Sequence, residues 1–371
     1  MKKLPLVDLK SQNRLLKNEI NNALNNTIDG ANFILGEEIK KFEKNYAKFC
    51  GARHCISLSS GTSALELALK VSGIMPGDEV ITVPNTFIAN AEAIIGVGAK
   101  PIFCEIDKQT FNIDTDLLKT LITKNTRAIM PVDLYGHPCD LDPIMELAAK
   151  HNLIVVDDAC QAHGAKYKGK VIGGVAHSTA FSFYPGKNLG AFGDAGCLTT
   201  NDDEFAVKTK SLRNHGRLND EKYKHGLIGS NYRMDELQAA ILNVKLKYLE
   251  GWVNARRKVA SKYREYISAK DVKHPTEAIY AKHAYHLYVI RIKKRDELRK
   301  FLNSNGISTG IHYPLPLHLQ PSLEFLGYKK NNFKITEEYA NTILSLPIYP
   351  ELTDDDISYV SNKINDFFND K

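Results

Sequence analysis

The sequence lacks the features that mark secreted, membrane and nucleic-acid-binding proteins. Its six cysteines form no Cys-x-x-Cys pair and lie mostly in apolar stretches, which favours reduced, packed thiols; Cys139, in "GHPCD", is expected to be the most exposed. No apolar run is long enough to cross a bilayer, and the start, "MKKLPLVDLKSQ", is polar. The formal charge of +6 is spread along the chain rather than gathered in a basic arm. We therefore expect a cytoplasmic protein with no metal, membrane or nucleic-acid partner.

The common nucleotide-binding motifs are also missing. The chain contains no Gly-x-Gly-x-x-Gly and no Gly-x-x-x-x-Gly-Lys-[Ser/Thr], and "GAFGDAG" at 190–196 has the wrong spacing for either. Internal repeats and low-complexity tracts are absent as well. Dinucleotide-binding and P-loop functions therefore lose most of their support.

The pattern that is present predicts an α/β fold. From about residue 50, short β-branched runs such as "DEVITVP" and "LIVVDDA" alternate with amphipathic helical stretches, which is typical of a mostly parallel sheet flanked by helices. The apolar spacing over 235–267 predicts one long helix that links two domains. We expect a large domain over residues 1–250, with 1–40 as an arm and helix packed on it, and a smaller C-terminal α+β domain over 251–371.

Residues that could bind a ligand or take part in catalysis follow several of the predicted strands, at the edge where parallel sheets bind ligands. "SSGTSALELAL" begins a helix whose free amides would suit an anion, "PNTFIANA" holds Phe87, and "VVDDA" ends in Asp157 and Asp158. "FSFYPGKNLGAFGDAG" adds Ser182 and Lys187. Each has an ordinary explanation when taken alone: a helix N-cap, a core aromatic, or a solvated lysine on a turn.

One cofactor would use all of these groups together. Pyridoxal 5'-phosphate (PLP, or PMP in its amino form) needs a lysine amine, a carboxylate beside its ring nitrogen, an anion site for its phosphate and an apolar group over its ring. The carboxylate keeps the ring nitrogen protonated, and the cationic ring then accepts electrons. Four such signals at four strand ends favour a catalytic role for Lys187 over a surface turn.

The order and wording of these motifs resemble the sugar aminotransferases of the DegT/DnrJ/EryC1/StrS family, a branch of the fold type I PLP enzymes. The resemblance covers nearly the whole chain and includes "LYGHPCDLDPI", "VVDDACQAHGA", "FSFYPGKNLGAFGDAG", "GSNYRMDELQAAIL" and "HYPLPLHLQP". It implies that Lys187 is the catalytic, Schiff-base lysine and that Asp158 contacts the pyridine nitrogen. It further implies Gln161 beside the ring oxygen and Phe87 stacked on the ring. The implied phosphate ligands are Gly61, Thr62 and Ser182.

The resemblance also implies a homodimer with active sites shared between subunits. Asn231 corresponds to an asparagine that reaches the phosphate from the partner subunit. Arg217, Arg233, Tyr313 and His318 are candidates for holding the hydroxyls and diphosphate of the substrate. A structural role for these four is equally compatible with the sequence.

The implied reaction moves an amino group from L-glutamate to a keto group of a nucleotide-linked sugar for amino-sugar or glycan biosynthesis. The motifs look closest to those of members acting on 3-keto-6-deoxy sugars carried on dTDP or UDP. Amination of a 4-keto nucleotide sugar or of a keto-cyclitol stays open. A protein of another class, a regulator that holds the cofactor without turnover, is a further alternative, and the Lys187 and Asp158 pair argues against it.

Overall fold

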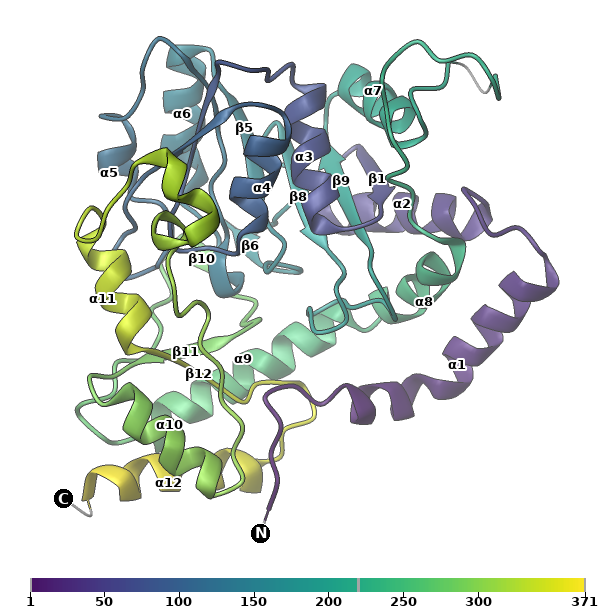
Figure 1. Ribbon diagram of the computed structural model, residues 1–371. Helices are drawn as coiled ribbons and strands as arrows, with labels where there is room; N and C mark the ends of the chain where they lie inside the picture. Colours follow the sequence, from purple (N-terminus) through teal and green to yellow (C-terminus); the bar gives the residue numbers. More distant parts are fainter. Residues whose placement is uncertain (1, 219–220, 370–371) are drawn as a thin grey trace.

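The computed structural model describes residues 2–218 and 221–369, and its centre is a seven-stranded sheet (Figure 1). The strand order is β1 (His54–Leu58), β9 (Gly196–Thr200), β8 (Ser178–Ser182), β5 (Ile154–Asp158), β4 (Thr126–Ile129), β2 (Glu79–Thr82) and β3 (Lys100–Phe103). Only β9 runs antiparallel to its neighbours in this sheet. The predicted mostly parallel α/β architecture is therefore confirmed.

Helices cover both faces of this sheet, because each strand points apolar side chains to both sides. On one face, Val156 and its neighbours pack against α3 (Gly61–Val71), α4 (Ala89–Gly96) and α7 (Asp203–Arg213). On the other, Val155 and its neighbours pack against α2 (Glu37–Cys50), α6 (Leu141–His151) and α8 (Glu236–Leu246). Side chains of adjacent strand residues point to opposite faces, so Asp157 and Asp158 are directed to different sides of the sheet.

The long helix predicted over 235–267 is two helices, α8 and α9 (Leu249–Tyr266). The chain turns at Lys247 and Tyr248, where the Tyr248 amide donates to the Lys245 carbonyl three residues back, at 3.0 Å. Both side chains at this turn reach Glu19 of α1 (Leu9–Asp29). The predicted continuous helix was wrong here because neither proline nor glycine marks the turn.

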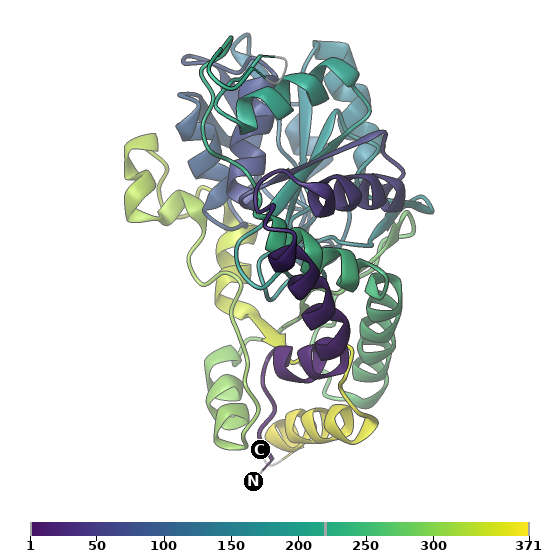
Figure 2. The same ribbon diagram turned by 90° about the vertical axis from the view of Figure 1, so that its right-hand side faces the viewer.

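A second hydrophobic cluster lies in the C-terminal part of the chain, below the main sheet in Figure 1. It surrounds the antiparallel pair β11 (Tyr288–Arg291) and β12 (Ile343–Leu346), with α9, α10 (Arg295–Ser304) and α12 (Asp354–Asn369) around it. The N-terminal arm joins this cluster: Leu4 is buried in it and bridges Ile307. The arm was expected to pack on the larger domain, and its position in the C-terminal cluster differs from that expectation. Helix α1 packs against α8, and Figure 2 shows α1 running between the two regions.

Short elements complete the described chain. They are α5 (Thr115–Leu118), α11 (Lys334–Thr342), β6 (Lys166–Tyr167), β7 (Lys170–Val171), β10 (Ala281–Lys282) and the 3-10 helices η1 (Leu134–Gly136), η2 (Leu317–Leu319) and η3 (Pro321–Leu326).

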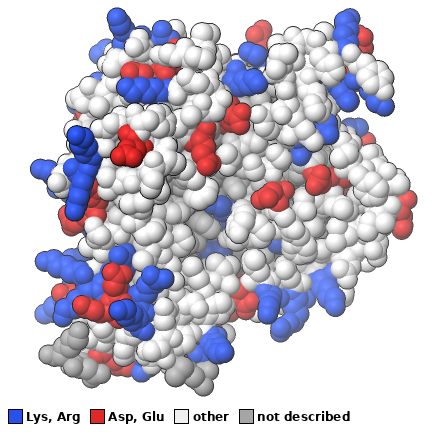
Figure 3. Space-filling view, in the orientation of Figure 1, with Lys and Arg blue, Asp and Glu red and all other residues white. Residues whose placement is uncertain are grey.

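The cysteines, the surface charges and the helix lengths can be compared with the predictions made from composition. All six cysteines are free thiols, and Cys139 is fully buried, contrary to expectation, because its amide donates to Asp133 Oδ1 and its thiol lies 3.2 Å from the Val132 carbonyl. Figure 3 shows acidic and basic side chains intermingled on one face. Among the described residues, every helix is too short or too polar to span a membrane.

Candidate active site

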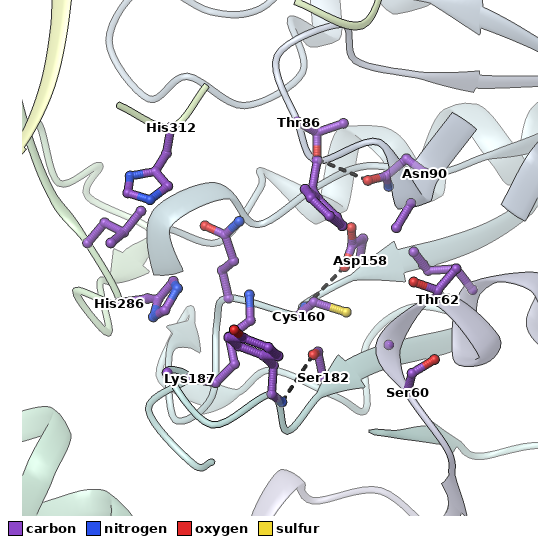
Figure 4. Close-up of a pocket in the computed structure, with 18 of the residues that line it drawn as sticks. Ser60, Thr62, Thr86, Asn90, Asp158, Cys160, Ser182, Lys187, His286 and His312 are labelled. Atoms are coloured by element: carbon purple, nitrogen blue, oxygen red, sulfur yellow. Dashed lines mark hydrogen bonds between the residues drawn. The ribbon is translucent and has the colours of Figure 1, made fainter. Parts of the chain in front are cut away.

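A cavity of about 570 Å³ lies at the carboxyl ends of the parallel strands (Figure 4). Its walls come from the segments that follow β1, β2, β5 and β8, and from the N-terminal arm and the C-terminal region. The residues predicted for cofactor contact that line it are Gly61, Thr62, Phe87, Asp158, Gln161, Ser182 and Lys187. The fold thus brings together in one place groups that are up to 126 positions apart in the sequence.

Lys187 is carried by the loop of residues 183–195 that joins β8 to β9. Two backbone hydrogen bonds close this loop on itself: Phe183 donates to the Ala195 carbonyl at 2.7 Å and Ala191 donates to the Phe183 carbonyl at 2.8 Å. Burial lowers the pKa of the Lys187 amine, and the nearby Cys160 and Asp158 only partly oppose that shift. A lowered pKa makes the neutral, nucleophilic amine easier to reach at physiological pH.

Asp158 is the last residue of β5, and its carboxylate lines the cavity. The backbone holds it firmly: its amide donates to the Pro131 carbonyl at 2.9 Å, and its carbonyl accepts from the Asp133 amide at 3.0 Å. Its Oδ1 accepts from the Cys160 amide at 3.1 Å. The carboxylate is therefore fixed in place and directed at the space in front of Lys187 (Figure 4).

The N-terminus of α3 forms a polar corner of the cavity. Ser60 and Ser63 make a capping box, in which each hydroxyl accepts from the other residue's amide at 3.0 Å. The helix end still presents its first amides and the positive end of its dipole, which together suit an anion. Gly61 is required here, because a Cβ would lie 2.7 Å from Ser182 Cβ and 2.8 Å from Cys160 Sγ.

Phe87 and Tyr313 form an aromatic wall. Their ring centroids are 5.8 Å apart, and Phe87 is 52% exposed, which is unusual for a phenylalanine that has only a core role. Gln161 links this wall to the sheet: its Oε1 accepts from the Tyr135 amide at 2.8 Å and its Nε2 donates to Tyr313 Oη at 3.3 Å. A flat ring bound in the cavity would find an apolar face at Phe87.

Two histidines that line the cavity were missed by the sequence reasoning. Burial lowers the pKa of His312 to about 4 and the pKa of His286 well below its usual value, and Lys187 acts in the same direction on both. His312 Nδ1 lies 2.8 Å from Ser345 Oγ. His312 adjoins the predicted Tyr313 and was within reach of the motif, whereas no sequence signal marked His286. Both rings are neutral, so they offer hydrogen bonds rather than charge.

Four predicted residues do not line the cavity of their own chain. Arg217, Asn231 and Arg233 lie on the segment after α7, where Arg233 donates to Asn214 Oδ1 at 2.8 Å. His318 has a fully buried side chain, and its Nε2 lies 3.0 Å from Glu337 Oε1. That position assigns His318 to the packing of the 313–333 segment rather than to the cavity.

The model of the DegT/DnrJ/EryC1/StrS aminotransferase family matches residues 14–365. The chain belongs to this family. Within it, a dTDP-3-amino-3,4,6-trideoxy-alpha-D-glucose transaminase of Streptomyces venezuelae is 41% identical over 94% of this chain and 92% of its own. A protein of Geobacillus stearothermophilus called a pleiotropic regulatory protein is 44% identical over 98% of both chains.

The solved structures of the family agree with this assignment. The S. venezuelae DesV structure in complex with a ketimine intermediate has a TM-score of 0.97 and 39% identity and covers 99% of both chains. Family enzymes use PLP as cofactor, and the predicted fold type I architecture is thereby confirmed. The residues present fit that group: one cavity offers an amine, a carboxylate, an exposed aromatic face and a helix N-terminus flanked by hydroxyls.

Proposed function

We propose that this PLP-dependent aminotransferase moves the amino group of L-glutamate to a keto group of a dTDP- or UDP-linked sugar, a 3-keto-6-deoxyhexose. The observation that carries the proposal is the placement of Lys187 and Asp158 on one cavity at the carboxyl ends of β8 and β5. When bound, PLP supplies an electron sink for the pair left behind when a C–H bond beside nitrogen is broken.

The chain's own residues supply attachment, charge and proton movement. Lys187 would hold the cofactor covalently through its amine, and its free amine would carry the proton that is removed from the substrate carbon. Asp158 would stabilise the protonated ring nitrogen through its negative charge. Phe87 would cover the ring, and Gln161 would donate to the ring oxygen.

The α3 corner holds the phosphate in this proposal. The amides of Gly61 and Thr62 and the Ser182 hydroxyl are the donors, and the α3 dipole adds a favourable field. Burial of the phosphate at this corner fixes one end of the cofactor, while Lys187 and Asp158 fix the other.

The substrate class follows from the remaining walls. His286, His312 and Tyr313 are uncharged donors and acceptors suited to sugar hydroxyls, while Leu6 and Val7 give an apolar surface for a deoxygenated carbon. The S. venezuelae relative named for a 3-amino sugar supports position 3. Amination at position 4 and amination of a keto-cyclitol are the alternatives, which a panel of 3-keto sugars, 4-keto sugars and a keto-cyclitol separates.

We also propose a homodimer in which a second copy completes each site. Arg217, Asn231 and Arg233 do not line their own chain's cavity, and the segment that carries them exposes Tyr223 and Ile228 at 83% and 86%. In the dimer these polar groups reach the phosphate of the cofactor and the diphosphate of the substrate. We place the cavity between a large domain, residues 1–250, and a smaller one, residues 251–371, in a cytoplasmic enzyme.

A regulator without turnover is the alternative of another class, and the name of the G. stearothermophilus relative favours it. One experiment separates the two. Purified holoenzyme is mixed with L-glutamate, and loss of the cofactor's visible absorbance is followed with 2-oxoglutarate release; 3-keto and 4-keto nucleotide sugars are then added, and NMR locates the new amine. We expect bleaching by glutamate and amination at carbon 3. A coloured protein that glutamate leaves unchanged would support the regulator.

A further inference from the structure

Helix α8 lies against the loop that carries Lys187 and contacts it at two points. Gln238 and Lys245 are seven residues apart on α8, which is about two helical turns, so they share one side of the helix. Gln238 Oε1 accepts from the Phe192 amide at 2.8 Å. Lys245 Nζ donates to the Gly190 carbonyl at 2.7 Å and lies 4.9 Å from the centroid of the Phe192 ring.

Lys245 is an unusual residue to find in this place. It is only 1% exposed, and in the part of the chain that the structure describes no carboxylate forms an ion pair with it. Burial lowers its pKa to about 8, and Glu351 opposes the shift only from a distance. Burying an ammonium group without a paired anion costs stability, so an apolar side chain would serve packing better. The hydrogen bond to the Gly190 carbonyl of the loop is the interaction that the buried ammonium group makes instead.

The geometry of the loop links this contact to Lys187. A Cβ on Gly190 would lie 2.2 Å from the Pro185 carbonyl oxygen, so the chain folds back on itself between these two residues. Lys187 lies inside that turn, and its amide donates to the Tyr184 carbonyl at 2.9 Å. The adjacent Asn188 donates to the Ala284 carbonyl at 3.0 Å. A constraint on Gly190 therefore limits where the Lys187 backbone can move.

We propose that Lys245, assisted by Gln238, is a positioning residue for Lys187: α8 holds the 183–195 loop so that the Lys187 amine faces the cavity. This inference rests on the proposed aminotransferase function and adds to it a residue outside the cavity. Small displacements of a reacting group lower rates steeply, since about 1 Å can cost a factor of about 100.

The contact itself is tested in the cofactor-free protein by hydrogen exchange. Lys245→Met keeps an unbranched side chain that is one atom shorter and removes its charge and its donor. Lys247→Met is the matched control, because Lys247 is exposed, directly follows the last residue of α8 and pairs with Glu19 at 3.2 Å, away from the loop. We expect exchange in peptides covering 184–192 to rise about tenfold or more in Lys245→Met and to stay at the wild-type rate in the control. Unchanged exchange in Lys245→Met would overturn the proposal.

The positioning role is tested in the holoenzyme by the rate at which saturating glutamate bleaches the visible absorbance. We expect Lys245→Met to slow this rate about 10- to 100-fold with little change in the half-saturating glutamate concentration, and Lys245→Arg to recover part of it. A purely structural residue would lower the melting temperature and leave the rate per bound cofactor unchanged, which would refute positioning.

Two outcomes keep this inference separate from the proposed function. If glutamate fails to bleach the wild-type enzyme, the aminotransferase proposal fails and takes the catalytic part of the inference with it, while hydrogen exchange still decides whether α8 holds the loop. If Lys245→Met does not fold, Gln238→Leu removes the second contact. A wild-type exchange pattern in that variant would then contradict the proposal that α8 holds the 183–195 loop.

Discussion

At the scale of single residues, the alternation of a strand gives two neighbouring aspartates opposite surroundings. Asp158 faces the cavity, whereas Asp157 is fully buried on the other face, and neither of its carboxylate oxygens has a hydrogen-bond partner among the described residues. Burial raises the pKa of Asp157 well above its usual value, and the nearby Asp133 and Asp158 add to the shift. The resemblance singled out Asp158 for the cofactor, whereas the burial of Asp157 without a hydrogen-bond partner became visible only in the folded chain.

Replacing Lys187 gives the most direct residue-level prediction. Lys187→Ala removes both the covalent attachment and the proton carrier, so we expect transamination to fall by a factor of about 1,000 or more. The measurement is 2-oxoglutarate formation, together with borohydride reduction and mass spectrometry of the peptide that contains residue 187. Labelling at another lysine in the wild-type protein would contradict the assignment.

The buried acid predicts a pH-dependent stability. A carboxyl group whose pKa is raised in the folded state contributes to the free energy of unfolding while it is protonated. This contribution is fully present below the unfolded-state pKa, about 3.9 for Asp, and is lost as the pH rises through the folded-state pKa. Burial also raises the pKa of Asp133, to about 7. Asp157→Asn stays neutral, so we expect its melting temperature relative to wild type to increase as the pH is raised from about 5 to about 8.

One contradicting outcome and one further measurement, of activity, complete this test. Parallel pH curves for the two proteins would show that Asp157 is not a raised-pKa group. Activity should stay within about threefold of wild type, because Asp157 does not line the cavity.

At the scale of elements, the strands and their terminal motifs were predictable, and the contacts between distant elements were not. The runs that predicted a parallel sheet became β2, β4, β5 and β8, because continuous apolar strands need helices on both faces. Tertiary contacts that the local sequence pattern does not encode determine three other features. They are the turn between α8 and α9, the hydrogen bond from Lys245 to the 183–195 loop, and the cavity wall at His286.

The close packing of α3 on β8 gives an element-level prediction. In Gly61→Ala the new methyl group would meet Ser182 and Cys160, so we expect α3 to shift away from β8 and the proposed phosphate donors to move with it. We expect the dissociation constant for PLP to rise about tenfold or more, measured by fluorescence titration of the cofactor-free protein. Gly251→Ala in α9 is the control, because its methyl group meets nothing within 4 Å. Equal PLP affinity in both variants would argue against a phosphate site at α3.

At the scale of the whole molecule, the segment of residues 214–233 carries Arg217, Asn231 and Arg233. The proposed contacts of these residues with cofactor and substrate exist only in a dimer. Tyr223 and Ile228 are exposed on it, and its arginines are not among the residues that line their own chain's cavity; both observations favour a second copy as the occupant of that surface. A symmetric pair would place each segment at the partner's site.

Complementation tests this arrangement. Lys187→Ala and Arg233→Ala are each expected to be nearly inactive, but a mixed dimer would hold one intact site, formed by Lys187 of one subunit and Arg233 of the other. Random re-association of an equal mixture should restore about a quarter of the wild-type activity. A mixture with no more activity than its parts, after subunit exchange has been verified by mass spectrometry, would exclude sites shared through Arg233.

The N-terminal arm has a consequence for how the enzyme is made. Leu4 bridges Ile307, more than 300 positions later in the chain, and Leu6 and Val7 line the cavity beside it. Residues 4–7 therefore find this partner only after the chain has been synthesised as far as residue 307. A nascent chain whose central sheet has folded, but which has not yet reached residue 307, therefore still lacks this wall of the cavity.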